Sequence, residues 1–251
     1  MDKTETERRL ASYYDIHHSR HPEDVDFWRQ LAERQGGPIL ELGCGTGRVL
    51  LPLAGAGHSI FGLDRNYAML ARLKDNLTPE SASRVLIMQA DLTSFQLAKQ
   101  FALIFLACNT FSALPGGDRM RCLENAAAHL APGGLFAASL PNPVLLAGLP
   151  DRSDAEVEEV FPDPETGDPI QVSSGWQRDQ QGFHLYWHYD RLMADGHVQR
   201  LSLRTTHAIH DRQTYLKELG MAGLRSVAVY GDYDFSAYRR SSPHLIIAAA
   251  F

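Results

Sequence analysis

The chain has 251 residues, of which 44% are hydrophobic, enough for one large domain or for a domain that carries an insertion. Its formal net charge is −6, which disfavours a nucleic-acid partner because such a partner requires a clustered basic surface. No run approaches the ~18 apolar residues of a membrane span, and three cysteines without metal-site spacing favour a reducing, cytoplasmic setting without a membrane partner.

The first 37 residues are predicted to form an arm followed by a helix. The arm, up to His21, is polar and then aromatic, and its paired histidines His17 and His18 are more often solvated than bound to a substrate. Pro22 precedes apolar residues at helical spacing, and Gly36-Gly37 ends that helix. The apolar positions of the helix are Val25, Trp28, Leu31 and Ala32.

Residues 38–54 predict a buried strand, a tight glycine loop and the start of a helix. Strand 38–42 is apolar, as expected of a strand covered on both faces. Gly43, Gly45 and Gly47 allow a sharp turn and let a ligand approach the main chain, because no Cβ blocks it. The next residues, from Val49 to Ala54, continue as one helical face.

A second strand, 59–63, ends in the carboxylate of Asp64. Asp64 follows Gly47 by 17 residues, the reach of one helix and a return strand, and can accept hydrogen bonds from a ribose diol. The dinucleotide fingerprint would place its third glycine where this chain has Arg48, which disfavours a nicotinamide cofactor. The alternative to a ligand-binding site is a purely structural glycine turn beside a surface aspartate.

Strands and helices alternate along the rest of the chain, which predicts a parallel sheet with crossover helices. A ligand is then expected outside the carboxyl ends of the first two strands. The predicted strands lie at 85–89, 101–107, 134–140, 224–230 and 244–251. The predicted helices lie at 66–75, 118–130 and 213–219, the last ended by Gly220.

The glycine loop, Asp64 and three further stretches together resemble class I S-adenosylmethionine-dependent methyltransferases. The further stretches are Asn66-Tyr67-Ala68-Met69-Leu70, Gln89-Ala90-Asp91-Leu92 and Leu130-Ala131-Pro132-Gly133-Gly134. The resemblance covers residues 11–142 and, more loosely, 212–251. It implies an α/β, Rossmann-like sheet of seven strands flanked by helices, in which the seventh strand runs antiparallel between the fifth and sixth.

The resemblance also implies a domain plan and a cofactor site. Residues 1–37 would cap the cofactor, 38–145 and 211–251 would form the core, and 146–210 would form an inserted β lid. The adenine is expected between Arg65 and Leu92, with Asp91 near its exocyclic amine. The residues implied to bind S-adenosyl-L-methionine are Tyr14, Glu41, Gly43, Cys44, Gly45, Gly47, Asp64, Arg65, Met69, Asp91, Leu92 and Ala107.

Residues 151–170 hold eight acids and one base, which predicts a solvated surface loop. Residues 171–210 predict antiparallel strands, with turns at Gln181-Gly182 and Asp195-Gly196. Side chains alternate along the middle strand. One face carries Phe183, Leu185, Trp187 and Tyr189, and the other carries His184, Tyr186, His188 and Asp190.

A substrate chamber is expected between this inserted sheet and the Tyr13–His18 arm. We expect Tyr186 and His188 to face it and Asn109 to lie near the transferred methyl group. In the alternative interpretation, the inserted strands form a sheet at the interface of a homodimer. Cys108 is expected to be a small wall residue rather than a nucleophile. No set of histidines and acids shows metal spacing, so no metal is expected.

The expected activity is transfer of a methyl group from S-adenosylmethionine to a nitrogen or oxygen of a small molecule. Methyl transfer depends mainly on positioning in a desolvated site, so a catalytic base is optional. Two alternatives stay open: a methyltransferase acting on RNA or protein, and a non-catalytic nucleotide-binding module.

Overall fold

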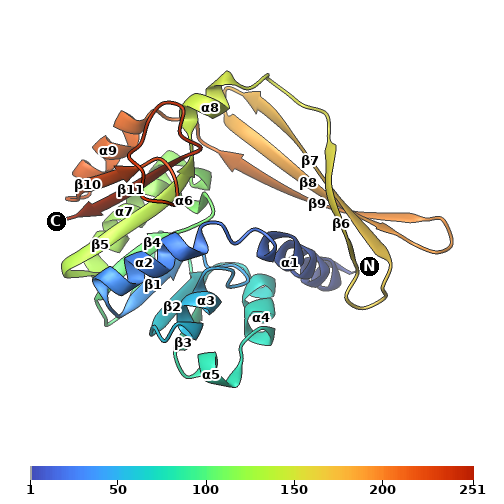
Figure 1. Ribbon diagram of the computed structural model, residues 1–251, viewed down its shortest axis with the longest axis horizontal. Helices are drawn as coiled ribbons and strands as arrows, with labels where there is room; N and C mark the ends of the chain where they lie inside the picture. The colour runs from blue at the N-terminus through green and yellow to red at the C-terminus, as the bar shows by residue number, and fades with distance from the viewer. Residues whose placement is uncertain (1) are drawn as a thin grey trace.

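The computed structural model describes residues 2–251, which form two separate sheets (Figure 1). The larger sheet has seven strands in the order β10-β11-β5-β4-β1-β2-β3. Its strands are β1 (Ile39–Leu42), β2 (Ile60–Asp64), β3 (Val85–Gln89), β4 (Phe101–Leu106), β5 (Leu130–Pro141), β10 (Arg225–Tyr230) and β11 (His244–Ala250). This order confirms the predicted Rossmann-like sheet.

Only β11 runs antiparallel to its neighbours in the larger sheet, between β5 and β10 as predicted. The other pairings are parallel, so the carboxyl ends of β1, β2 and β4 meet at one edge. Strand β3 has the predicted bounds, whereas β5 begins at Leu130, four residues before the predicted start. The turn motif before the predicted fifth strand is therefore part of that strand.

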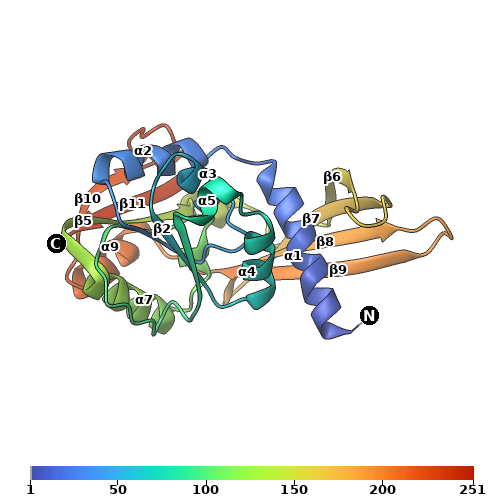
Figure 2. The same ribbon diagram turned by 90° about the horizontal axis from the view of Figure 1, so that it is seen from below.

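Helices cover both faces of the larger sheet (Figure 2). Helices α2 (Val25–Gln35), α3 (Leu50–Gly55) and α4 (Tyr67–Asp75) bury Trp28, Leu53 and Leu73 against one face. On the opposite face, α6 (Thr110–Ala113), α7 (Gly116–His129) and α9 (Arg212–Met221) pack around Leu40 and Phe136. Short helices α5 (Pro79–Ala82) and α8 (Pro143–Gly148) precede β3 and follow β5.

The smaller sheet is antiparallel and follows β5 in the chain, which confirms the predicted insertion. Its strands are β6 (Glu156–Pro162), β7 (Pro169–Asp179), β8 (Gly182–Leu192) and β9 (Val198–His207), in that order. Helix α1 (Lys3–Ser19) crosses one face of this sheet, as Figure 2 shows. Tyr13 of α1 packs there against Phe161, Val172 and Tyr189 in a third hydrophobic cluster.

The prediction that residues 151–170 form a loop is wrong, although most of these residues are exposed as predicted. Strand β6 lies within this segment, at the edge of the sheet, and its Glu159 meets Arg20, the residue that caps the C-terminal end of α1. Arg20 Nη1 lies 2.9 Å from Glu159 Oε2, and Tyr13 donates a 2.5 Å hydrogen bond to the buried Asp163. The acidic run is therefore the surface that receives α1, a tertiary role that composition alone does not reveal.

Three smaller observations complete the fold. Helix α9 continues to Met221, so Gly220 lies inside it rather than ending it. Within residues 2–251 no helix combines the length and the apolar character needed to cross a membrane. All three cysteines are free thiols.

Candidate functional site

The glycine loop joins β1 to α3 and is held tightly by its neighbours. The Gly43 and Cys44 amides donate to the Leu63 carbonyl at 2.7 and 3.1 Å, which fixes the loop against the end of β2. Gly43 has a φ of +77°, and a Cβ there would lie 2.7 Å from Thr110 Cγ2. A side chain would therefore be strained and would clash with the start of α6, so the loop offers bare main chain at this edge.

Asp64 lies at the end of β2 and faces the loop. Its Oδ2 accepts a 2.9 Å hydrogen bond from the Gly45 amide, and its Oδ1 accepts a 2.8 Å bond from the Asn66 amide. A carboxylate oxygen has two acceptor positions, so each oxygen of Asp64 retains one for a ligand. The geometry fits a diol presented beside the loop.

A narrow cavity of about 180 Å³ opens beside Asp64 at the carboxyl ends of β2 and β3. Residues predicted to surround the adenine come together here, although they belong to separate strands. The lining includes Gly43, Asp64, Arg65, Asp91, Leu92, Thr93, Thr110, Ala113, Leu114 and Asp118. Asp91 accepts two hydrogen bonds from Thr93, which lower the pKa of its carboxyl group.

A larger cavity of about 450 Å³ lies between the two sheets; we call it the inter-sheet cavity. Helix α1 and strands β8 and β9 enclose one side, and the β4–α6 turn with Arg48 encloses the other. Its lining includes Tyr14, His18, His21, Asp24, Arg48, Cys108, Asn109, Leu185, Trp187, Thr205, His207 and Tyr233. Cys108 and Asn109 line this cavity while the next residue, Thr110, lines the smaller one, so the two cavities lie on either side of this turn.

The β4–α6 turn is strained. Cys108 and Asn109 both have positive φ, at 54° and 61°. Arg48 Nη2 donates to Cys108 Sγ at 2.7 Å, and desolvation by the surrounding protein atoms raises the pKa of the thiol to about 11, although Cys108 as a residue is exposed. Cys108 is therefore a neutral thiol in the wall, as the sequence predicts. The buried Asn109 Oδ1 has no hydrogen-bond partner among residues 2–251 and is free to accept one from a ligand.

Two histidines of the inter-sheet cavity are neutral at physiological pH. His18 stacks on Tyr14 with ring centroids 3.9 Å apart, and its Nδ1 donates to the Tyr14 carbonyl. Burial lowers the pKa of His18 to about 3, and burial lowers the pKa of His207 to about 4. His207 Nδ1 lies 2.9 Å from Ser112 Oγ. These rings add aromatic surface to the cavity without adding positive charge.

Glu41 is buried beneath the glycine loop, with 3% of its surface exposed. Its Oε2 has no partner within the described part of the chain, and burial raises the pKa of the carboxyl group well above its usual range. An unsatisfied buried acceptor costs about 1–3 kcal/mol. A cationic ligand group at the loop would give this atom a partner, which fits the ammonium of a bound amino acid.

The structure places Tyr186 and His188 on the opposite face of the inserted sheet, so their predicted position in the chamber is wrong. They line a separate surface cavity of about 240 Å³, where His188 Nδ1 lies 2.8 Å from Ser202 Oγ. The predicted alternation is correct, but α1 covers the Leu185–Trp187–Tyr189 face and leaves Tyr189 fully buried. The alternation of side chains assigns residues to the two faces of a strand, but it does not show which face a helix from a distant part of the chain covers.

Some of the other predicted site residues line one of the two cavities, and others line neither. Tyr14 and Asn109 line the inter-sheet cavity, whereas Met69, Cys44 and Ala107 line neither cavity. Asp15, the neighbour of Tyr14, instead accepts hydrogen bonds from Arg72 and Asn76 and so ties α1 to α4.

Sequence reasoning missed several wall residues of the inter-sheet cavity. Thr205 and His207 lie two residues apart on β9, so they share one face of the strand, and this spacing was the signal that the sequence offered. Tyr233 comes from the segment after β10 and carries no such signal.

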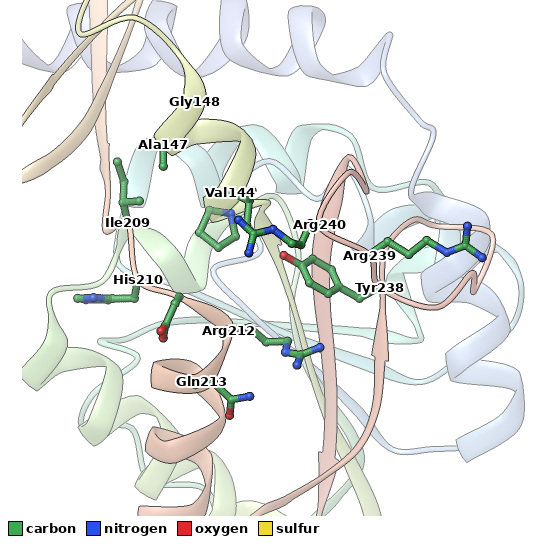
Figure 3. Close-up of a pocket in the computed structure, with 12 residues that line it drawn as sticks. Val144, Ala147, Gly148, Ile209, His210, Arg212, Gln213, Tyr238, Arg239 and Arg240 are labelled. Atoms are coloured by element: carbon green, nitrogen blue, oxygen red, sulfur yellow. The ribbon is translucent and has the colours of Figure 1, made fainter.

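A further cavity, of about 780 Å³, is larger than the inter-sheet cavity and is shown in Figure 3. It lies between α8 and the start of α9, and its lining includes Val144, His210, Arg212, Tyr238 and Arg240. No residue of the glycine loop reaches it. Size alone therefore does not identify the site; the loop, Asp64 and the inter-sheet cavity do.

Comparisons with known proteins point the same way. Residues 39–134 match a family model described as a methyltransferase domain. The chain is 26% identical over 246 residues to YqeM of Bacillus subtilis, named as a candidate methyltransferase, covering 91% of each chain. Among solved structures, an S-adenosylmethionine-dependent methyltransferase from Clostridium acetobutylicum superposes with a TM-score of 0.78, at 15% identity, over 96% of this chain and 97% of that one. The sugar N-methyltransferase KedS8 from a Streptoalloteichus species gives a TM-score of 0.73, at 21% identity, over 94% and 92%.

Proposed function

Because the chain is a class I S-adenosylmethionine-dependent methyltransferase, we propose that it methylates a nitrogen atom of a small molecule held in the inter-sheet cavity. The observation that carries the proposal is the Cys108–Thr110 turn, which lines the inter-sheet cavity with two residues and the smaller cavity with the third. A cofactor held by the glycine loop would approach this turn from one side, and an acceptor in the inter-sheet cavity would approach it from the other.

The residues that would hold the cofactor are present and fit its groups. S-adenosylmethionine, when bound, supplies the methyl group as a sulfonium substituent. Asp64 has free acceptor positions for the ribose hydroxyls, and Glu41 has an unpartnered oxygen for the ammonium group. Arg65 and Leu92 line the smaller cavity, where a planar adenine would lie between them.

The inter-sheet cavity supplies part of what a methyl transfer needs from the protein. Tyr14, His18 and Trp187 present aromatic surface, and the inserted sheet covers one side of the site. Such a displacement depends on holding the nucleophile in line in a desolvated site. An amine that arrives neutral needs no base, so none of the titratable side chains that line the cavity has to serve as one.

Nitrogen is favoured as the acceptor atom because a neutral amine needs no general base, whereas a hydroxyl gains more from one. The unpartnered Asn109 Oδ1 can accept a hydrogen bond from an N–H group and so orient the lone pair of the amine. The resemblance in fold to KedS8, a sugar N-methyltransferase, supports a small amine-bearing acceptor. A cavity of about 450 Å³ closed by α1 and β8 leaves little room for a folded RNA or protein.

The test is a transfer assay with a labelled methyl group and matched acceptors. Small amines, including amino sugars, are compared with analogues in which a hydroxyl replaces each amine. We expect label in the amines, with S-adenosylhomocysteine formed in equal amount. Methylation of the hydroxyl analogues alone would refute nitrogen as the acceptor. Failure of S-adenosylhomocysteine to bind in calorimetry would refute the cofactor site.

A further inference from the structure

Three metal-ligating side chains meet at the junction of α1 and the inserted sheet. His17 lies in the last turn of α1, His21 follows two residues after the end of that helix, and Glu159 lies on the edge strand β6. One ligand atom from each lies within 4.8 Å of the others, and His17 Nε2 is 3.9 Å from Glu159 Oε1. The glutamate is far from the histidines in the sequence, so residue spacing gives no sign of the group.

His17 is already oriented as a metal ligand would be. It is 4% exposed, and its Nδ1 lies 3.2 Å from the Tyr189 hydroxyl, which fixes the ring from behind. Such a second hydrogen bond typically sets the orientation of a ligating imidazole. The other nitrogen, Nε2, faces two carboxylates, Glu158 Oε2 at 3.1 Å and Glu159 Oε1 at 3.9 Å.

Glu159 supplies an independent sign that a ligand is missing. Its Oε2 is paired with Arg20 Nη1 at 2.9 Å. Its Oε1 is buried and has no hydrogen-bond partner among residues 2–251. Native structures rarely leave a buried carboxylate oxygen unpaired, so an atom that lies beside two histidines is expected to have a partner that is not part of the chain.

We propose that His17, His21 and Glu159 bind a zinc ion. Two imidazoles and one carboxylate, completed by water, form a ligand set that Zn²⁺ accepts. Ligand atoms of a tetrahedral zinc ion lie about 3.4 Å apart, so small side-chain rotations bring these three into place. Glu158 is near enough to His17 to replace the water.

The ion would connect two elements that enclose the inter-sheet cavity. His21 lines that cavity, and β6 belongs to the sheet that covers it. Zinc at this position would tie the end of α1 to the inserted sheet, and the cavity would be held closed. This role is separate from methyl transfer and stands whatever the acceptor is.

The experiment uses the full chain without a polyhistidine tag. Zinc affinity is measured by competition with a chromophoric chelator, and Co²⁺ is added in parallel to record the visible bands of tetrahedral coordination. We expect one ion per chain and a higher midpoint of thermal unfolding with zinc. His21→Ala and Glu159→Gln should each weaken zinc binding at least tenfold and remove the Co²⁺ bands.

Two control variants separate ligation from general effects. His197→Ala removes an exposed histidine that has one carboxylate neighbour, and should bind zinc as the wild type does. Arg20→Ala breaks the ion pair with Glu159 but keeps the ligand, and should bind zinc at least as tightly. The proposal is overturned if the wild type does not compete for zinc, or if His21→Ala and His197→Ala bind it equally.

Discussion

Arg48 and Asp24 form a two-pronged ion pair, with Nη1–Oδ1 at 2.5 Å and Nη2–Oδ2 at 2.7 Å. Arg48 directly follows the glycine loop, and Asp24 directly precedes α2. The side chains are only 14% and 4% exposed. The residue that distinguishes this loop from a dinucleotide fingerprint therefore also fastens the loop to the N-terminal helices.

Loss of this pair should destabilise the fold. Arg48→Met leaves the Asp24 carboxylate buried without its cation, which should lower the free energy of unfolding by about 3 kcal/mol. Chemical denaturation measures the change. The double variant Arg48→Met/Asp24→Asn should recover more than half of it, because no charge is then left unpaired. Arg29→Met breaks an exposed ion pair and should cost about 0.5 kcal/mol or less; an equal cost at both arginines would contradict the argument.

Asp64 should control cofactor affinity. Asp64→Ala removes the proposed ribose acceptor and the bond to the Gly45 amide, so affinity for S-adenosylhomocysteine should fall at least tenfold, at about 1.5–3 kcal/mol per hydrogen bond to a charged group. Isothermal calorimetry gives the dissociation constant. Asp195→Ala, in an exposed turn, serves as the control and should bind like the wild type. Unchanged affinity in Asp64→Ala would remove Asp64 from the cofactor site.

The two faces of β8 should differ in their effect on turnover. Trp187→Ala opens the wall of the inter-sheet cavity and should lower kcat/KM roughly tenfold or more, about 1.4 kcal/mol of transition-state stabilisation. His188→Ala changes the opposite face and should leave kcat/KM unaltered. Steady-state kinetics with the identified acceptor decide, and the reverse result would show that the sheet presents its other face to the acceptor.

His207 should make stability depend on pH. Its pKa is lowered to about 4 by burial, below the unfolded value of about 6.5. The unfolded chain therefore takes up the proton first, and stability present above pH 6.5 is lost as the pH falls toward 4. The loss attributable to His207 is about 3 kcal/mol. Denaturation curves at several pH values should show a smaller loss for His207→Gln; parallel pH profiles would argue against a buried neutral imidazole.

The sequence predicted the larger sheet well because local patterns determine it. The apolar run Pro38–Leu42, the glycine loop and Asp64 each report on neighbouring residues, and β3 was predicted to the residue. Arg65, Asp91 and Leu92 were expected together because Gln89-Ala90-Asp91-Leu92 resembles the third-strand motif of the methyltransferase family, and in the structure all three line one cavity.

Contacts between distant segments could not be predicted from the sequence. The side of the inserted sheet that faces the cavity depends on where α1 packs, and nothing near Tyr186 or Trp187 encodes that choice. From the sequence, the acids of β6 are predicted to be solvated, because only the folded chain brings Arg20 and His17 against them. Thr205, His207 and Tyr233 became wall residues only through the same long-range packing.

The position of α1 between the two sheets has a consequence for folding during synthesis. Its partners on one side, such as Arg72, leave the ribosome early, but Tyr189 and Leu201 follow more than 170 residues after Tyr13. At about 5–20 residues per second, this interval lasts roughly ten to forty seconds. Throughout that time α1 has only half of its binding surface. The helix that closes the cavity is therefore expected to reach its final place late, after the inserted sheet has emerged.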